Sequence, residues 1–259
     1  MLYKFFLYII FNLLFINILV AQGEIDEQRI LYYRDEKSVN FTLSSNGFGL
    51  GYQFGKRINY TQRKLYDLNI AYLKDPKEQK IQSSSGYKFV FGKLNTVISL
   101  RPSYGFQKEI FTKKDKGGIS IKYFYTYGPS IAVLKPIYYK FFSDDEGIYQ
   151  KFNEDVHTLI NDIEKKAPFF KGIKETKLSP GIHGRFGFNF EYSNLETVIH
   201  AIEIGIGAEL FLTKIPIMAF EQNKHQFFLL LFVSYRLGKM VYPYQREKNK
   251  KLLENLKLD

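Results

Sequence analysis

Alternating apolar and polar positions dominate this chain. Residues 182–192 show the pattern best: the even positions carry Ile, Gly, Phe, Phe, Phe and Tyr, and the odd positions carry His, Arg, Gly, Asn and Glu. Successive side chains of a β-strand point to opposite faces of a sheet, so this stretch would have one apolar, aromatic face and one charged face. The pattern predicts an amphipathic strand, and it recurs along the chain.

Reading the whole chain for this period of two predicts an all-β, antiparallel fold with ten strands. Their lengths suit strands that cross a membrane at a tilt, and a closed transmembrane β-barrel is the architecture that such strands form. The first hairpin has the weakest pattern, so eight strands is the alternative. The ten candidates are 38–45, 47–55, 64–73, 87–93, 96–106, 118–127, 130–139, 182–192, 197–212 and 226–238.

The connections between these strands differ in length in an ordered way. Outer-membrane barrels have short periplasmic turns and longer external loops, and an even strand count returns both termini to the periplasm. The connections predicted on the periplasmic side are short: 56–63, 94–95, 128–129 and 193–196. Four of the five predicted on the external side are long: 74–86, 107–117, 140–181 and 213–225.

The N-terminus has the features of a secretory signal. Lys4 precedes an apolar run, and Ala21-Gln22 provides a small-residue cleavage site. We therefore predict a signal peptide over 1–21, a periplasmic segment over 22–37, the barrel over 38–238 and a basic periplasmic tail over 239–259.

Composition narrows the class of protein. The mean hydropathy of −0.23 argues against several membrane-spanning helices, and the absence of cysteine excludes disulfides and thiolate metal sites. The formal net charge of +11 favours anionic partners, but no nucleic-acid motif accompanies it. The predicted partners are therefore outer-membrane lipid, lipopolysaccharide and other envelope proteins, with no nucleic acid.

A soluble β-sandwich or lipocalin-like barrel would alternate in the same way, with the aromatic face turned inward. The signal segment and the loop lengths favour the membrane interpretation. In that case the charged face lines the lumen, where mixed charges in a narrow space should pair and fill it. The predicted lumenal network comprises Asp67, Lys88, Arg101, Lys122, Arg185, Glu191, Glu203, Glu209 and Arg236.

The long external segment 140–181 has a helical period within it. The apolar residues recur at helical spacing over 152–166, so we predict a short amphipathic helix that covers the barrel mouth or docks a partner. The apolar face of this predicted helix comprises Phe152, Val156, Leu159, Ile160 and Ile163.

Catalytic chemistry finds little support in the sequence. His183 with Asp144 or Asp145 is the one pair that could act at the outer rim, and nothing in their spacing requires it. The four histidines are not clustered as metal ligands would be. We predict a non-catalytic protein without cofactor or metal, and a rim-acting lipid hydrolase is an alternative.

Most of the chain resembles small outer-membrane β-barrel proteins of Bacteroidota. The resemblance rests on the signal ending Val20-Ala21-Gln22 and on the segments Asn46–Gly55, Asp75–Glu78, Gly92–Asn95 and Leu134–Tyr138. It implies a structural or accessory role in an envelope protein complex, and it assigns no catalytic residue. A narrow channel for small solutes is a further alternative.

Overall fold

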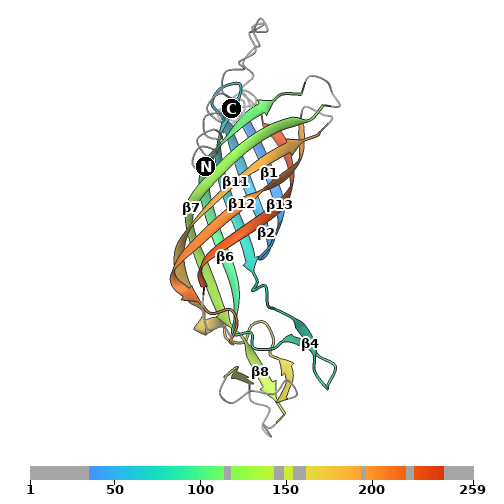
Figure 1. Ribbon diagram of the computed structural model, residues 1–259, viewed down its shortest axis with the longest axis vertical. Helices are drawn as coiled ribbons and strands as arrows, with labels where there is room; N and C mark the ends of the chain where they lie inside the picture. The colour runs from blue at the N-terminus through green and yellow to red at the C-terminus, as the bar shows by residue number, and fades with distance from the viewer. Residues whose placement is uncertain are drawn as a thin grey trace, which may run out of the picture. The chain divides into compact units, whose positions relative to one another are not determined.

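The computed structural model describes residues 35–113, 118–142, 149–153, 162–193, 197–219 and 225–241. Eight antiparallel strands close into a barrel in the order β1-β13-β12-β11-β7-β6-β3-β2 (Figure 1). The strands are β1 (Asp35–Ser44), β2 (Gly47–Arg57), β3 (Gln62–Leu73), β6 (Asn95–Phe111), β7 (Ser120–Pro136), β11 (Lys177–Glu191), β12 (Val198–Ile215) and β13 (His225–Val241). The barrel thus begins and ends three residues outside the predicted range of 38–238. No helix among the described residues is long and apolar enough to cross a membrane.

The main prediction of ten strands is wrong, and the alternative of eight is right. The predicted strands 118–127 and 130–139 are largely one strand, β7, which runs straight through the expected turn at Gly128-Pro129. On the β6 side, Leu100 faces Ile131 and Tyr104 faces Tyr127, so the register is the same before and after the interruption. Proline has no N–H to donate to a neighbouring strand, so Pro129 interrupts the pairing without ending the strand.

The second lost strand is 87–93. Only Lys88–Val90 of this range forms a strand, β5, and it pairs with β4 (Lys80–Gln82) in a two-stranded sheet outside the barrel. The first hairpin, which has the weakest pattern, is by contrast a regular part of the barrel as β1 and β2.

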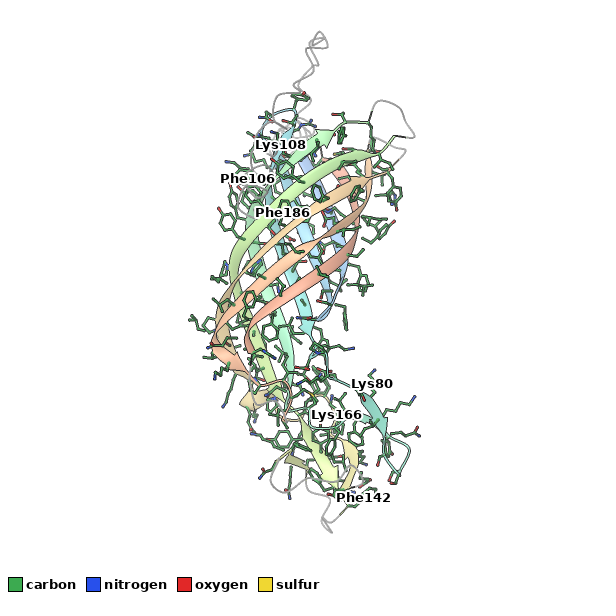
Figure 2. The ribbon with its side chains drawn as sticks, in the orientation of Figure 1. Lys80, Phe106, Lys108, Phe142, Lys166 and Phe186 are labelled. Carbon is green, nitrogen blue, oxygen red and sulfur yellow. The ribbon has the colours of Figure 1, made fainter. Side chains whose placement is uncertain are left out.

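The predicted outward faces are outward in the structure. Along β12, Ile202, Ile204 and Ile206 are exposed, whereas the intervening Glu203 is buried. Figure 2 shows Phe106 and Phe186 pointing away from the barrel wall. Their rows continue around the barrel as a belt of exposed apolar side chains.

The two ends of the barrel differ strongly. Asp35 of β1 pairs with Val241 of β13, so the described chain enters and leaves at the same end, here called the terminal end. The β2–β3, β6–β7 and β11–β12 connections lie there. The sequence predicted 107–117 on the external side, opposite the termini. The end of β6 at Phe111 and the start of β7 at Ser120 instead lie at the terminal end, because the barrel has fewer strands than predicted. The long β3–β6 and β7–β11 connections lie at the opposite, far end (Figure 1).

The far-end connections form a small lobe. A three-stranded sheet, ordered β10-β8-β9, joins β8 (Tyr138–Phe141), β9 (Tyr149–Lys151) and β10 (Ile163–Lys166), and the β4-β5 sheet lies in the same region. Ile163, predicted to be helical, is therefore in a strand. Phe152 lies in neither helix nor strand, and Val156, Leu159 and Ile160 lie outside the described residues. The predicted helix over 152–166 has no support at its described ends.

Phe152 and Ile163 belong to the apolar core of this lobe, together with Phe89, Ile137 and Phe141. Tyr139 lies in the same core, and its hydroxyl donates to the backbone oxygens of Val90 and Lys93 at 3.0 and 2.9 Å. Since Phe152 and Ile163 are 5% and 0% exposed, they hold the lobe together and are not available for docking.

Candidate functional site

The inward face of the barrel carries a balanced set of buried charges. Eight of the nine predicted lumenal residues lie there, whereas Lys88 is exposed on β5 outside the barrel, a correction that follows from the loss of the 87–93 strand. Glu36 and Arg63 join the set; both lie just outside the strand boundaries that the sequence pattern predicted. The buried inward carboxylates are Glu36, Asp67, Glu191, Glu203 and Glu209, and the buried inward cations are Arg63, Arg101, Lys122, Arg185 and Arg236.

The group nearest the terminal end is a chain of ion pairs. Lys122 Nζ lies 2.5 Å from Glu191 Oε2 and 3.7 Å from Glu36 Oε1. Arg63 in turn lies 2.8 Å from Glu36. Lys113 at the rim lies 3.3 Å from Glu191, so alternating charges connect four strands and the adjoining turn.

Ion pairs continue along the barrel interior. Arg236 of β13 pairs with Glu203 of β12, and Asn189 donates a 2.9 Å hydrogen bond to the same carboxylate. Arg185 lies 3.7 Å from Asp67 on the other side of the barrel. Removing one partner would leave the other charge buried without a counter-charge. The resulting loss of stability exceeds the net stabilisation that the intact pair provides.

The last pair toward the far end is Arg101 and Glu209. Arg101 Nη2 lies 2.5 Å from Glu209 Oε2, and Ser99 donates a 2.5 Å hydrogen bond to the other carboxylate oxygen. His183 lies opposite Glu209 in the β11–β12 register and is buried. His183 therefore lies inside the wall and not at an open rim. Asp144 and Asp145, the two acids predicted to pair with it, lie outside the described residues.

Among the described residues, the inward side chains are closely packed in the lumen. A cavity of about 10 Å³ remains between Arg101, Arg185 and Phe232. This volume is about that of one water-sized sphere. Nearer the far end of the barrel, Leu73, Val97 and Phe211 belong to a buried apolar layer. Eight strands enclose a space that side chains can fill, and these residues do so.

Lys135 shares the parity of the outward Ile131 and Val133 on β7, yet it is buried. The structure places it against the segment that leads into β11: its ammonium donates to the carbonyls of Phe169 and Lys171 at 2.6 and 3.3 Å. It also lies 4.6 Å from the centre of the Phe169 ring. These contacts hold the segment 169–171 against the last residues of β7, which ends at Pro136.

The same segment presents an aromatic and basic surface. Phe170 is 79% exposed, and Phe169, Lys171 and Lys174 are exposed beside it. Figure 2 shows two further side chains of the lobe, Phe142 and Lys166. We call residues 169–174 the lobe loop.

An exposed ion pair joins the lobe loop region to β9. Lys151 pairs with Glu175, and the hydroxyl of Tyr138 donates to the same carboxylate. The hydrogen bond from Lys151, followed by that from Tyr138, lowers the pKa of Glu175 from its ordinary value. The pair is therefore intact at neutral pH and is lost on acidification, when Glu175 takes up a proton.

We expect Lys151→Met to raise the pKa of Glu175, because the largest cause of its depression is removed. A carboxyl-detected NMR titration of the wild type and the variant would measure this shift. An unchanged Glu175 pKa in the variant would show that the pair does not form in solution.

No cluster of three or more His, Asp or Glu side chains that could hold a metal ion occurs among the described residues. Neither a protein-family model nor a curated protein matches the sequence.

Several solved structures have a similar fold. Neisserial surface protein A matches with 10% identity and a TM-score of 0.37, over 80% of this chain and 96% of that one. Ail, the attachment invasion locus protein of Yersinia pestis, matches in its complex with the heparin analogue sucrose octasulfate with 8% identity and a TM-score of 0.36, over 80% of this chain and 97% of that one. The N-terminal β-barrel domain of Pseudomonas aeruginosa OprF matches with 8% identity and a TM-score of 0.36, over 82% of this chain and 99% of that one. The resemblance to Bacteroidota barrels stays a prediction.

Proposed function

We propose that this chain is an outer-membrane barrel with a closed lumen, which anchors its far-end lobe outside the membrane as an accessory part of an envelope protein complex. Both termini then lie in the periplasm. The protein acts through its surface and not through catalysis or transport.

The observation that carries this proposal is the apolar belt. Large aliphatic and aromatic side chains are exposed on all eight strands or at their ends, and the opposite faces carry paired charges. A soluble protein rarely exposes so large a continuous apolar surface, whereas a barrel in lipid requires one. Exposed members of the belt include Val39, Leu50, Leu68, Tyr127, Phe188, Ile204 and Leu231, and the half-buried Leu100 of β6 continues it.

The difference between the barrel ends supports the orientation and the accessory role. Two of the three terminal-end connections, 58–61 and 192–197, are short, and the third spans 112–119. The far end carries folded sheets with exposed aromatic and basic side chains in the lobe loop. Aromatic residues are enriched at the centres of protein contact surfaces. A filled lumen gives no path for a solute, which argues for contact over conduction.

The absence of cysteine from the sequence makes a clean test possible. We expect Phe170→Cys to react with a membrane-impermeant maleimide–benzophenone in intact cells, because the lobe loop lies outside. Illumination should then join it to one envelope protein, identified by mass spectrometry. The measurement is the labelled and cross-linked fraction.

Asn59→Cys in the exposed β2–β3 turn is the matched control. It should react only after the outer membrane is broken, because its turn faces the periplasm. Labelling of Asn59→Cys but not Phe170→Cys in intact cells would reverse the orientation. Labelling of Phe170→Cys without a defined cross-linked partner would contradict the accessory role and leave the location intact.

A further inference from the structure

A cavity of about 740 Å³ lies at the far-end rim of the barrel. The ends of β7, β11 and β12 form one side of it, and residues of the lobe form the other. Sites for small molecules in proteins commonly have volumes of 300–1,000 Å³, so this rim cavity is large enough for a ligand.

The inner part of the rim cavity is apolar. Leu134 of β7 and Leu94, Ile137 and Phe152 around the lobe line it. Leu178 lines it from β11 and is 67% exposed. Leu178 belongs to the same outward row of β11 as Ile182 and Phe186, which are part of the apolar belt, so the apolar lining is continuous with the surface that faces lipid.

The charged lining has an excess of cations. Lys151, Lys177 and Lys214 contribute three positive charges, and Glu175 contributes one negative charge. Lys151 and Glu175 neutralise each other as an ion pair. Within the described part of the chain, Lys177 and Lys214 have neither an ion-pair partner nor a side-chain hydrogen bond, so two positive charges remain available.

These two lysines lie on neighbouring strand ends. Ser179 of β11 and Thr213 of β12 join their hydroxyls at 2.6 Å, which shows that the two strands still run side by side at the rim. Lys177 and Lys214 are each within two residues of this contact. Both lysines line the rim cavity, so an anion in it can meet ammonium groups from both strands.

We propose that the rim cavity binds one lipid with an anionic phosphate headgroup. The phosphate interacts with Lys177 and Lys214, and an acyl chain lies along Leu178 and the apolar lining. This inference deepens the proposed function, on which its membrane setting rests, because a bound lipid would fix the lobe to the membrane surface.

The test uses the purified full chain in the neutral detergent dodecyl maltoside, titrated with dilauroyl phosphatidic acid and followed by native mass spectrometry. We expect one saturable lipid adduct in the wild type. In Lys177→Gln/Lys214→Gln the Kd should rise at least about tenfold, the loss expected when charge-assisted hydrogen bonds are removed. Lys80→Gln, which removes an exposed lysine of β4 that does not line the cavity, should bind as the wild type does.

Two competitors distinguish the source of the anion. Dilauroyl phosphatidylcholine should compete weakly, because its choline group offsets the phosphate charge, and inorganic phosphate should compete weakly, because it has no acyl chain. Full competition by inorganic phosphate would replace the proposal with a free-anion site. Equal binding by the double variant would overturn it. Because no membrane is present in this measurement, either failure leaves the proposed outer-membrane location untouched.

Discussion

Arg236→Met should lower the free energy of unfolding by about 3–5 kcal/mol, the cost of breaking one half of a buried ion pair. Arg236 and Glu203 are each 1% exposed, and they face each other inside the barrel. Without Arg236, the Glu203 carboxylate keeps the hydrogen bond from Asn189 but loses its counter-charge. Urea titration of the protein folded into lipid vesicles would measure the change.

The double variant Arg236→Met/Glu203→Gln separates charge from packing. It removes both charges and leaves an amide that can still accept from Asn189, so it should be clearly more stable than Arg236→Met alone. Lys151→Met is the matched control, because its ion pair with Glu175 is exposed and should contribute no more than about 1 kcal/mol. A double variant as unstable as the single one would show that Arg236 acts through its volume and not through its charge.

The alternation of residues was sufficient to predict the faces of the strands but not their number. A two-residue turn at Gly128-Pro129 would put Tyr127 and Ser130 on the same face. The apolar residues instead stay at odd positions from Ile119 to Val133, which is the register of one unbroken strand. The sequence therefore contained the evidence for one strand, but the prediction gave more weight to Gly128-Pro129, a dipeptide typical of turns.

The lumenal charges could be found because a barrel wall imposes a strict period of two. Glu36 and Arg63 have the parity of their strands and were missed only because the strand ends were drawn too short. Lys88 was wrongly included in this network. The alternation over 87–93 does not show whether the strand belongs to the barrel or to a separate sheet, and it belongs to the β4-β5 sheet. The rim cavity could not be predicted, because it forms where three strand ends meet segments far away in the sequence.

A charge in the middle of the apolar belt tests the membrane setting itself. We expect Ile204→Lys to destabilise the protein in lipid vesicles by about 2–4 kcal/mol, the cost of a lysine facing lipid near the bilayer midplane. Ile204 lies near the middle of β12, is 50% exposed, and pairs with Phe188 and Val233 on its two sides. Its side chain is on the outward face of the barrel, opposite the lumenal charges, so the cost would come from the lipid.

Leu212→Lys is the matched control on the same strand and the same outward row. Leu212 is 74% exposed near the far end of β12, where a lysine can reach the interface, so its cost should be only about 0–1 kcal/mol. The soluble alternative makes the opposite prediction, because an exposed isoleucine in water can be replaced by lysine within about 0.5 kcal/mol at either depth. A large difference between the two destabilisation energies would mean that the polarity of the surroundings changes along β12, as it does across a bilayer. Small and equal destabilisation by both variants would instead place this apolar belt in water.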